Sequence, residues 1–132
     1  MEHLAGIAIG DEGEASTTVT EALTVRHFQP TMPDVYGTPF MILLMEVASA
    51  NAINPRLPEG WMSVGVDVNI RHLAATPRGR TVRAKARVIE VTDKLVRFEV
   101  EAWEGEKLIG KGTHSRAPIE LARFERGLAS AG

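Results

Sequence analysis

The stretch TPFMILLMEVASA at residues 38–50 decides the fold, because it holds a single ionisable group, Glu46, among apolar neighbours. A helix that is apolar on every face is a buried helix, and other elements must cover several of its sides. A carboxylate within such a helix is costly unless it is paired, hydrogen-bonded or protonated. Glu46 is therefore either a structural residue at a helix end or subunit contact, or a functional group whose burial tunes its chemistry.

The sequence marks both ends of this helix. Thr38 is predicted to be the N-cap, and Pro39 follows at the first helical position, where proline is favoured. The segment NPRLPEG at residues 54–60 is rich in helix breakers, so the helix should end near Ala52. Free backbone N–H groups around Gly37 and Thr38, together with the positive end of the helix dipole, would suit a developing oxyanion.

The rest of the chain is predicted to be mostly strands. An alternating pattern at residues 18–27 predicts a strand before the helix, and residues 1–17 read as a flexible lead-in. Four further strands are predicted at residues 61–72, 80–91, 94–103 and 107–115, and a short helix should follow within residues 116–128. This order indicates a single α+β domain over residues 18–128. A curved antiparallel sheet of about five strands would wrap the central helix, and a second copy would cover the remainder.

The strand at residues 61–72 ends on a second candidate functional residue, His72. Counting by two places His72 on the face expected to meet the helix, together with Met62, Val64, Val66, Val68 and Ile70. His72 is then either a satisfied core histidine or the partner of Glu46 in acid–base chemistry. His27 and His114 also fit strand positions, where a structural role is favoured.

Thr38 and Glu46 are eight residues apart on one helix, which separates them by about 12 Å along its axis. Side chains at that distance do not easily share one reacting carbon. If both residues serve the same site, they should come from different chains. A two-fold dimer with antiparallel helices would bring the start of one helix near the middle of the other.

Composition argues against several functional classes. Fifteen basic and 17 acidic residues give a net charge of −2 without a basic block, which argues against nucleic-acid binding. The chain has no cysteine, no apolar run long enough for a bilayer and no positively charged leader, so a cytoplasmic protein with no membrane partner is expected. Neither metal-ligand spacing nor a phosphate-binding loop is present, so no metal and no cofactor are expected.

TPFM at residues 38–41, Glu46, and VGVDVNIRHLAATPRG at residues 64–79 together form a recognisable pattern. With it, the chain resembles the fluoroacetyl-CoA thioesterase-like family of hotdog-fold proteins over about residues 19–119. The resemblance implies a hotdog fold, a homodimer or tetramer, and hydrolysis of an acyl-CoA thioester. It also implies a catalytic triad of Thr38, Glu46 and His72. The expected substrate contacts around this triad are Tyr36, Gly37, Pro39 and Gly65.

Several alternatives stay open at this point. The connection at residues 29–36 is expected to lie over the pocket and is not rich in aromatic residues, so a small acyl and an aryl-acyl group are both compatible. Glu46 could act as nucleophile or as general base for water, and Thr38 could position the substrate or be acylated. A non-catalytic acyl-binding dimer would use Glu46 as a specificity contact. A hotdog hydratase or dehydratase would need an acid near the helix start, for which Asp34 is the only candidate.

Overall fold

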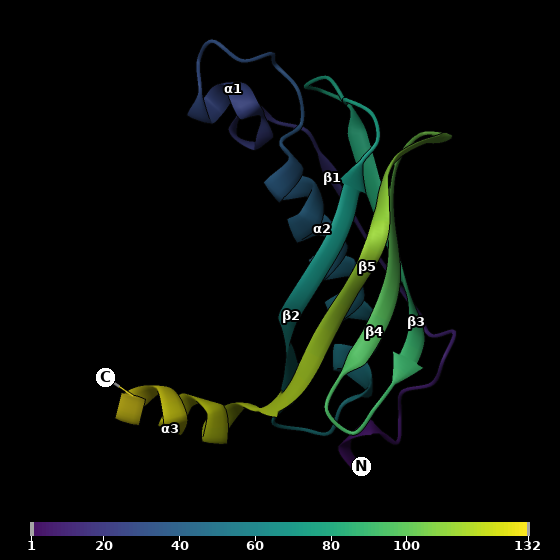
Figure 1. Ribbon diagram of the computed structural model, residues 1–132, viewed down its shortest axis with the longest axis vertical. Coiled ribbons are helices and arrows are strands. Elements are labelled where there is room, and N and C mark those ends of the chain that lie inside the picture. Colours follow the sequence, from purple (N-terminus) through teal and green to yellow (C-terminus); the bar gives the residue numbers. More distant parts are fainter. Residues whose placement is uncertain (1, 132) are drawn as a thin grey trace.

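The computed structural model describes residues 2–131 and shows one antiparallel sheet whose inner face is crossed by the long helix α2 (Thr38–Ile53) (Figure 1). The five strands lie in the order β1-β3-β4-β5-β2. Their bounds are Glu12–Thr18 for β1, Trp61–His72 for β2, Thr81–Val91 for β3, Val96–Glu104 for β4 and Lys107–Glu120 for β5. The predicted α+β arrangement, with a central helix and about five strands, is confirmed.

Shorter helical elements complete the chain. They are η1 (Glu2–Leu4), η2 (Glu21–Leu23), α1 (Val25–Phe28), η3 (Asn54–Arg56) and the C-terminal helix α3 (Leu121–Ala131). Figure 1 shows α3 projecting away from the sheet, beyond the edge formed by β2. Helix α3 is longer than the short closing helix that the sequence predicts. No helix within residues 2–131 combines the length and the apolar character needed to cross a bilayer.

The core lies between α2 and the inner face of the two central strands. Alternate residues of β3 and β4 are fully buried, as a period of two requires: Val82, Ala84, Ala86, Val88, Val96, Phe98, Val100 and Ala102. Helix α2 meets this face with Met41, Met45, Ala48, Ala52 and Ile53. Many of these side chains are alanine, which lets the helix axis come close to the sheet.

The side of α2 that faces away from the sheet is left uncovered by residues 2–131. Leu43 is 53% exposed and Val47 is 42% exposed, although both are large apolar residues. Leaving such residues in water forfeits about 1.5–3 kcal/mol of burial free energy each. Within residues 2–131, the helix predicted to be buried all round is therefore buried on one side only.

The first strand lies earlier in the chain than predicted. Residues 12–18 form β1, whereas residues 18–27, where the sequence pattern predicts a strand, contain the end of β1 followed by η2 and α1. Gly13 of β1 packs against the backbone of α2 at Ala48 and Ala52, so a side chain has no room there. Close packing on the helix requires small residues in β1, and small residues give little hydrophobic signal. Residues 12–17, the last part of the lead-in predicted at residues 1–17, thus belong to an edge strand.

Strand β2 differs from the prediction in which of its residues face the helix. Its pairing with β5 shifts between Gly65 and Asp67, so Val66 is an extra, bulged residue. Before the bulge Gly65 pairs with the buried Arg116, and after it Val68 pairs with the buried His114. Paired residues share a face, so the inward set changes from odd to even positions. Met62, Val64 and Val66 therefore do not share the inner face with Ile70 and His72.

The contact between β1 and α2 yields a stability prediction. Gly13→Ala would place a methyl group against the backbone of Ala48 and Ala52. We expect it to lower the free energy of unfolding by about 1–3 kcal/mol, the usual cost of overpacking. Urea denaturation measures this change. Gly127→Ala in α3 is the matched control, because nothing lies within 4 Å of its added methyl group. Equal stability of the two variants would contradict the close packing of β1 on α2.

Candidate functional site

The start of α2 and the end of β2 bring Thr38 and His72 into direct contact. The Thr38 hydroxyl lies 2.7 Å from Nδ1 of His72. Thr38 is the first residue of α2, and Gly37 occupies the N-cap without a side-chain capping bond. The predicted N-cap role of Thr38 is therefore wrong, because its hydroxyl is engaged by the imidazole instead of a backbone N–H.

His72 is placed as a neutral acceptor for that hydroxyl. Burial lowers the pKa of His72 below its ordinary value, because the charged imidazolium is poorly solvated there. When Nε2 carries the proton, Nδ1 can accept the hydrogen of the Thr38 hydroxyl, as in pairs of a hydroxyl nucleophile and a base. Nε2 is buried and has no hydrogen-bond partner within residues 2–131.

A hollow of about 430 Å³ opens beside this pair. Thr38 and His72 line it together with Met32, Pro33, Val35 and Tyr36, so the connection at residues 29–36 does border the pocket. Tyr36 is almost fully buried, and its hydroxyl donates to the carbonyl of Phe40 at 3.1 Å. Burial raises the pKa of Tyr36 to about 12, so the residue is a neutral wall of the hollow.

The other two residues near the helix start contribute differently from what was expected. The N–H of Gly37 donates to the carbonyl of Leu23 at 2.9 Å, so it is not free to bind an oxyanion. Pro39 is exposed at the second position of α2 and has no N–H. The N–H of Thr38, which belongs to the opening turn of the helix, has no acceptor inside the helix. Of the two backbone N–H groups expected to bind an oxyanion, those of Gly37 and Thr38, that of Thr38 is the one suited to do so.

Glu46 lies in a second hollow, of about 330 Å³, between α2 and β2. Its side chain is half-buried and borders this open space, so it is not sealed in the core. Gly65 of β2 faces it directly: a Cβ atom on Gly65 would lie 2.6 Å from Oε1 of Glu46. Glycine is therefore required at position 65 for the carboxylate to occupy its place. The bulge that follows Gly65 is what turns this residue toward the helix.

Sequence reasoning missed a buried arginine beside Glu46. Arg116 of β5 is only 8% exposed and borders the same hollow. Its Nε donates to Oγ of Ser63 at 2.8 Å, and Nη2 donates to the backbone carbonyl of Ser63 at 2.8 Å. Nη1 lies 3.2 Å from Nε2 of His114. The predicted strand ended at residue 115, whereas β5 continues to Glu120 and includes Arg116.

Burial and nearby charges shift the pKa values of both Arg116 and His114. Burial lowers the pKa of Arg116, and the neighbouring Glu46 carboxylate partly offsets this effect. Burial also lowers the pKa of His114, with a smaller contribution in the same direction from the Arg116 cation. The lowered pKa favours a neutral His114. This histidine, predicted to be structural, contacts Arg116, which borders the same hollow as Glu46.

Within one chain the three residues of the predicted triad do not meet. Thr38 and His72 border one hollow, and Glu46 borders the other. Two turns of α2 separate Thr38 from Glu46, or about 12 Å along the axis. The structure therefore brings together Thr38 with His72, and Glu46 with Gly65, as two half-sites.

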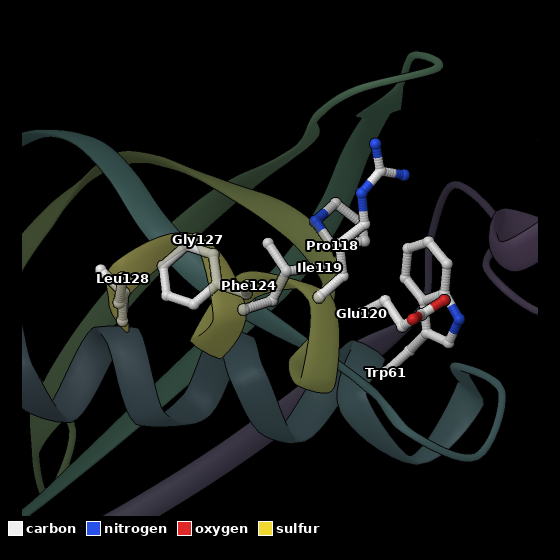
Figure 2. Close-up of a pocket in the computed structure, with 8 residues that line it drawn as sticks. Trp61, Pro118, Ile119, Glu120, Phe124, Gly127 and Leu128 are labelled. Carbon is white, nitrogen blue, oxygen red and sulfur yellow. The ribbon is translucent and has the colours of Figure 1, made fainter. Parts of the chain in front are cut away.

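A further hollow lies between α3 and the start of β2, with Trp61 at one end and Phe124 and Leu128 toward the other (Figure 2). Its volume is about 480 Å³, and Glu120 and Arg123 are its charged residues. It contains none of the predicted site residues. Asp34, the acid considered for a hydratase, forms an ion pair with Arg78 at 2.7 Å. This pairing leaves it poorly suited to proton transfer.

Comparisons with known proteins identify the family of the chain. A sequence profile described as fluoroacetyl-CoA-specific thioesterase matches residues 19–122. The chain belongs to this family. The fluoroacetyl-CoA thioesterase of Streptantibioticus cattleyicolor is 37% identical to it over 125 residues, which cover 90% of each chain.

Solved structures of similar proteins have the same fold. A crystal structure of the fluoroacetyl-CoA thioesterase FlK matches with a TM-score of 0.88 at 34% identity, over 96% of this chain and 98% of that one. A thioesterase superfamily member from Thermus thermophilus matches with a TM-score of 0.89 at 33% identity, over 96% and 94% of the two chains. A hot-dog-like protein from Thermanaerovibrio acidaminovorans has a TM-score of 0.89 at 20% identity. The hotdog fold implied by the family resemblance is confirmed.

The buried position of His114 predicts a pH dependence of stability. Its pKa is lower in the folded state than the ordinary value of 6.5, so below that pH the unfolded chain binds more protons. We expect the contribution of His114 to the free energy of unfolding to be fully present above about pH 6.5. It should be lost as pH falls through the folded-state pKa. Each unit of pKa difference corresponds to about 1.4 kcal/mol.

Urea denaturation at pH 7.5 and pH 5.5 measures this dependence. We expect His114→Gln to show a smaller loss of stability at pH 5.5 than the wild-type protein. An identical loss in His114→Gln and the wild type would contradict a depressed pKa at His114.

Proposed function

We propose that this protein hydrolyses an acyl-CoA thioester at a site made by two chains, with Thr38 and His72 from one chain and Glu46 from the other. The observation that carries the proposal is the hydrogen bond between Thr38 and His72 at one end of α2, with Glu46 facing open space two turns away. The named activity of the S. cattleyicolor relative supports a CoA thioester as substrate. A FlK variant has also been crystallised in complex with acetyl-CoA, which favours a small acyl group.

The chemistry requires water to add to the thioester carbonyl and the thiol of CoA to leave. Glu46 takes a proton from the attacking water, so that a C–O bond forms as the C–S bond breaks. The N–H of Thr38, at the positive end of α2, stabilises the negative charge that develops on the carbonyl oxygen. The proton taken from water goes to the departing sulfur, and the products are a carboxylic acid and free CoA. Gly65, beside Glu46, leaves room for the carboxylate that acts as the base.

Two features support a homodimer that completes this site. Strand β2 forms one edge of the sheet, so one side of this 12-residue strand has no neighbouring strand in the described part of the chain. Val66 and Val68 on β2 are 53% and 45% exposed, next to the uncovered side of α2. Pairing of β2 with its copy about a two-fold axis would cover these residues and set the two α2 helices antiparallel.

Substitution of Glu46 tests the chemical step. We expect Glu46→Gln, with folding intact, to lower kcat by at least about a hundredfold, because general-base catalysis contributes about 10²–10⁴-fold. Release of CoA thiol, measured with a free-sulfhydryl reagent, gives the rate. Glu59→Gln, at an exposed glutamate in the loop before β2, is the matched control and should retain normal turnover. Near-normal turnover by Glu46→Gln would remove this residue from the mechanism.

Mixing of inactive variants tests whether the site is shared. Thr38→Ala and Glu46→Gln chains, unfolded together and refolded, should regain up to about a quarter of the wild-type activity. Half of the dimers are then mixed, and each mixed dimer has one intact site of two. Thr38→Ala mixed with His72→Asn should show no recovery, because those two residues serve the same half-site. Absence of recovery in the first mixture, with mixed dimers present, would show that each site lies within one chain.

A panel of acyl-CoA substrates separates hydrolysis from simple binding. Thiol release from acetyl-, fluoroacetyl-, butyryl- and benzoyl-CoA reports both activity and the preferred acyl group. Saturable binding of these compounds without thiol release by the wild-type protein would instead support a non-catalytic acyl-binding dimer.

A further inference from the structure

The guanidinium of Arg116 is held by neutral groups, which is unusual for a buried cation. Ser63 accepts two of its hydrogen bonds, one at Oγ and one at the backbone carbonyl, and His114 accepts the third. Among residues 2–131, no carboxylate oxygen lies within 4.0 Å of this guanidinium. A buried cation with a purely structural role is normally paired directly with an anion. Here the charge is left available to the hollow that Glu46 borders.

Hydrogen bonding specifies the protonation of His114. Its Nδ1 lies 2.8 Å from the backbone carbonyl of Asp67, which can only accept a hydrogen bond, so Nδ1 carries the proton. In the neutral ring Nε2 is then an acceptor, and it accepts from Nη1 of Arg116 at 3.2 Å. Protonation of Nε2 would remove this acceptor and place a second positive charge against the guanidinium. His114 can therefore hold Arg116 only as a neutral imidazole.

On its other side the guanidinium is held by Ser63, which is itself fixed by Asn54 at the end of α2. Oγ of Ser63 donates to Oδ1 of Asn54 at 2.7 Å, which leaves its lone pairs free to accept from Nε of Arg116 at 2.8 Å. The guanidinium thus has little freedom to turn. The place for a Cβ on Gly65 lies 2.6 Å from Glu46 Oε1, 3.2 Å from His114 Cε1 and 3.7 Å from Arg116 Nη1, so all three side chains converge there.

We propose that His114 is a positioning residue for thioester hydrolysis: its neutral imidazole holds the Arg116 guanidinium beside the Glu46 carboxylate. This inference rests on the proposed function, because it needs Glu46 to take part in the reaction. The guanidinium adds a fixed positive charge next to the reacting carboxylate, and its direction depends on the acceptor at Nε2 of His114. His114 itself does not border the hollow, so it acts through Arg116 and not on the substrate.

Two substitutions of His114 separate hydrogen bonding from packing. His114→Phe keeps a ring stacked on Phe98 but removes both hydrogen bonds, whereas His114→Gln supplies an acceptor for Arg116 and a donor for the Asp67 carbonyl. We expect His114→Phe to lower kcat about tenfold or more, the loss associated with a hydrogen bond to a charged group, with KM changed less than about threefold. His114→Gln should recover most of the lost kcat.

Ser63→Ala provides a second variant should His114→Phe fail to fold, because it removes the Oγ acceptor on the opposite side of Arg116. We expect it too to lower kcat more than KM. Thermal denaturation of each variant confirms that the assayed protein is folded. Wild-type kcat in folded His114→Phe, or equal losses in His114→Phe and His114→Gln, would overturn the proposal. If His114→Phe does not fold, wild-type kcat in Ser63→Ala would overturn it.

Glu46→Gln, assayed in parallel, distinguishes this inference from the function on which it rests. Loss of turnover in Glu46→Gln with normal turnover in His114→Phe rejects the positioning role alone. Normal turnover in Glu46→Gln removes Glu46 from the mechanism and rejects the positioning role with it. No thiol release by the wild-type protein rejects the proposed hydrolysis itself.

Discussion

The packing of α2 against the inner face of the sheet is the constraint on which the rest of the structure depends. Small residues on the sheet, such as Gly13 on β1 and Ala84 on β3, allow the helix to lie close to the strands. The sheet covers one side of α2 and leaves the side that carries Leu43 and Val47 exposed. Glu46 lies at the boundary between these two sides, where it can border both protein and open space.

The β-bulge at Val66 converts this packing into a candidate site. Without an extra residue in β2, the inward positions would stay in phase and bulky valines would fill the space beside Glu46. The register shift instead turns Ser63 and Gly65 inward before the bulge and His72 inward after it. One local irregularity therefore makes room for the carboxylate, provides acceptors for Arg116 and brings His72 to Thr38. Bulges recur next to active sites because they redirect side chains in this way.

The polar groups near Glu46 show how the fold tolerates charge in a small domain. Arg116 loses solvation on burial. The three hydrogen bonds that its guanidinium donates to Ser63 and His114 compensate for part of that loss. These partners are neutral, so they satisfy the guanidinium without cancelling its charge. The hydrolytic role proposed for Glu46 depends on such an environment, in which a carboxylate and a cation lie close together without forming a direct ion pair.

The sequence alone determined the fold class, the long helix with Glu46, and strand β2 from Trp61 to His72, because hydrophobic periodicity and helix breakers are local signals. It also singled out Thr38 and His72. Only the tertiary structure decided that Thr38 donates its hydroxyl to His72 and not to the helix backbone, that β1 begins at Glu12, and that Arg116 and His114 adjoin Glu46. These outcomes depend on register, on a single bulged residue and on the close approach of strand and helix, and such contacts between distant segments have no signature in local composition.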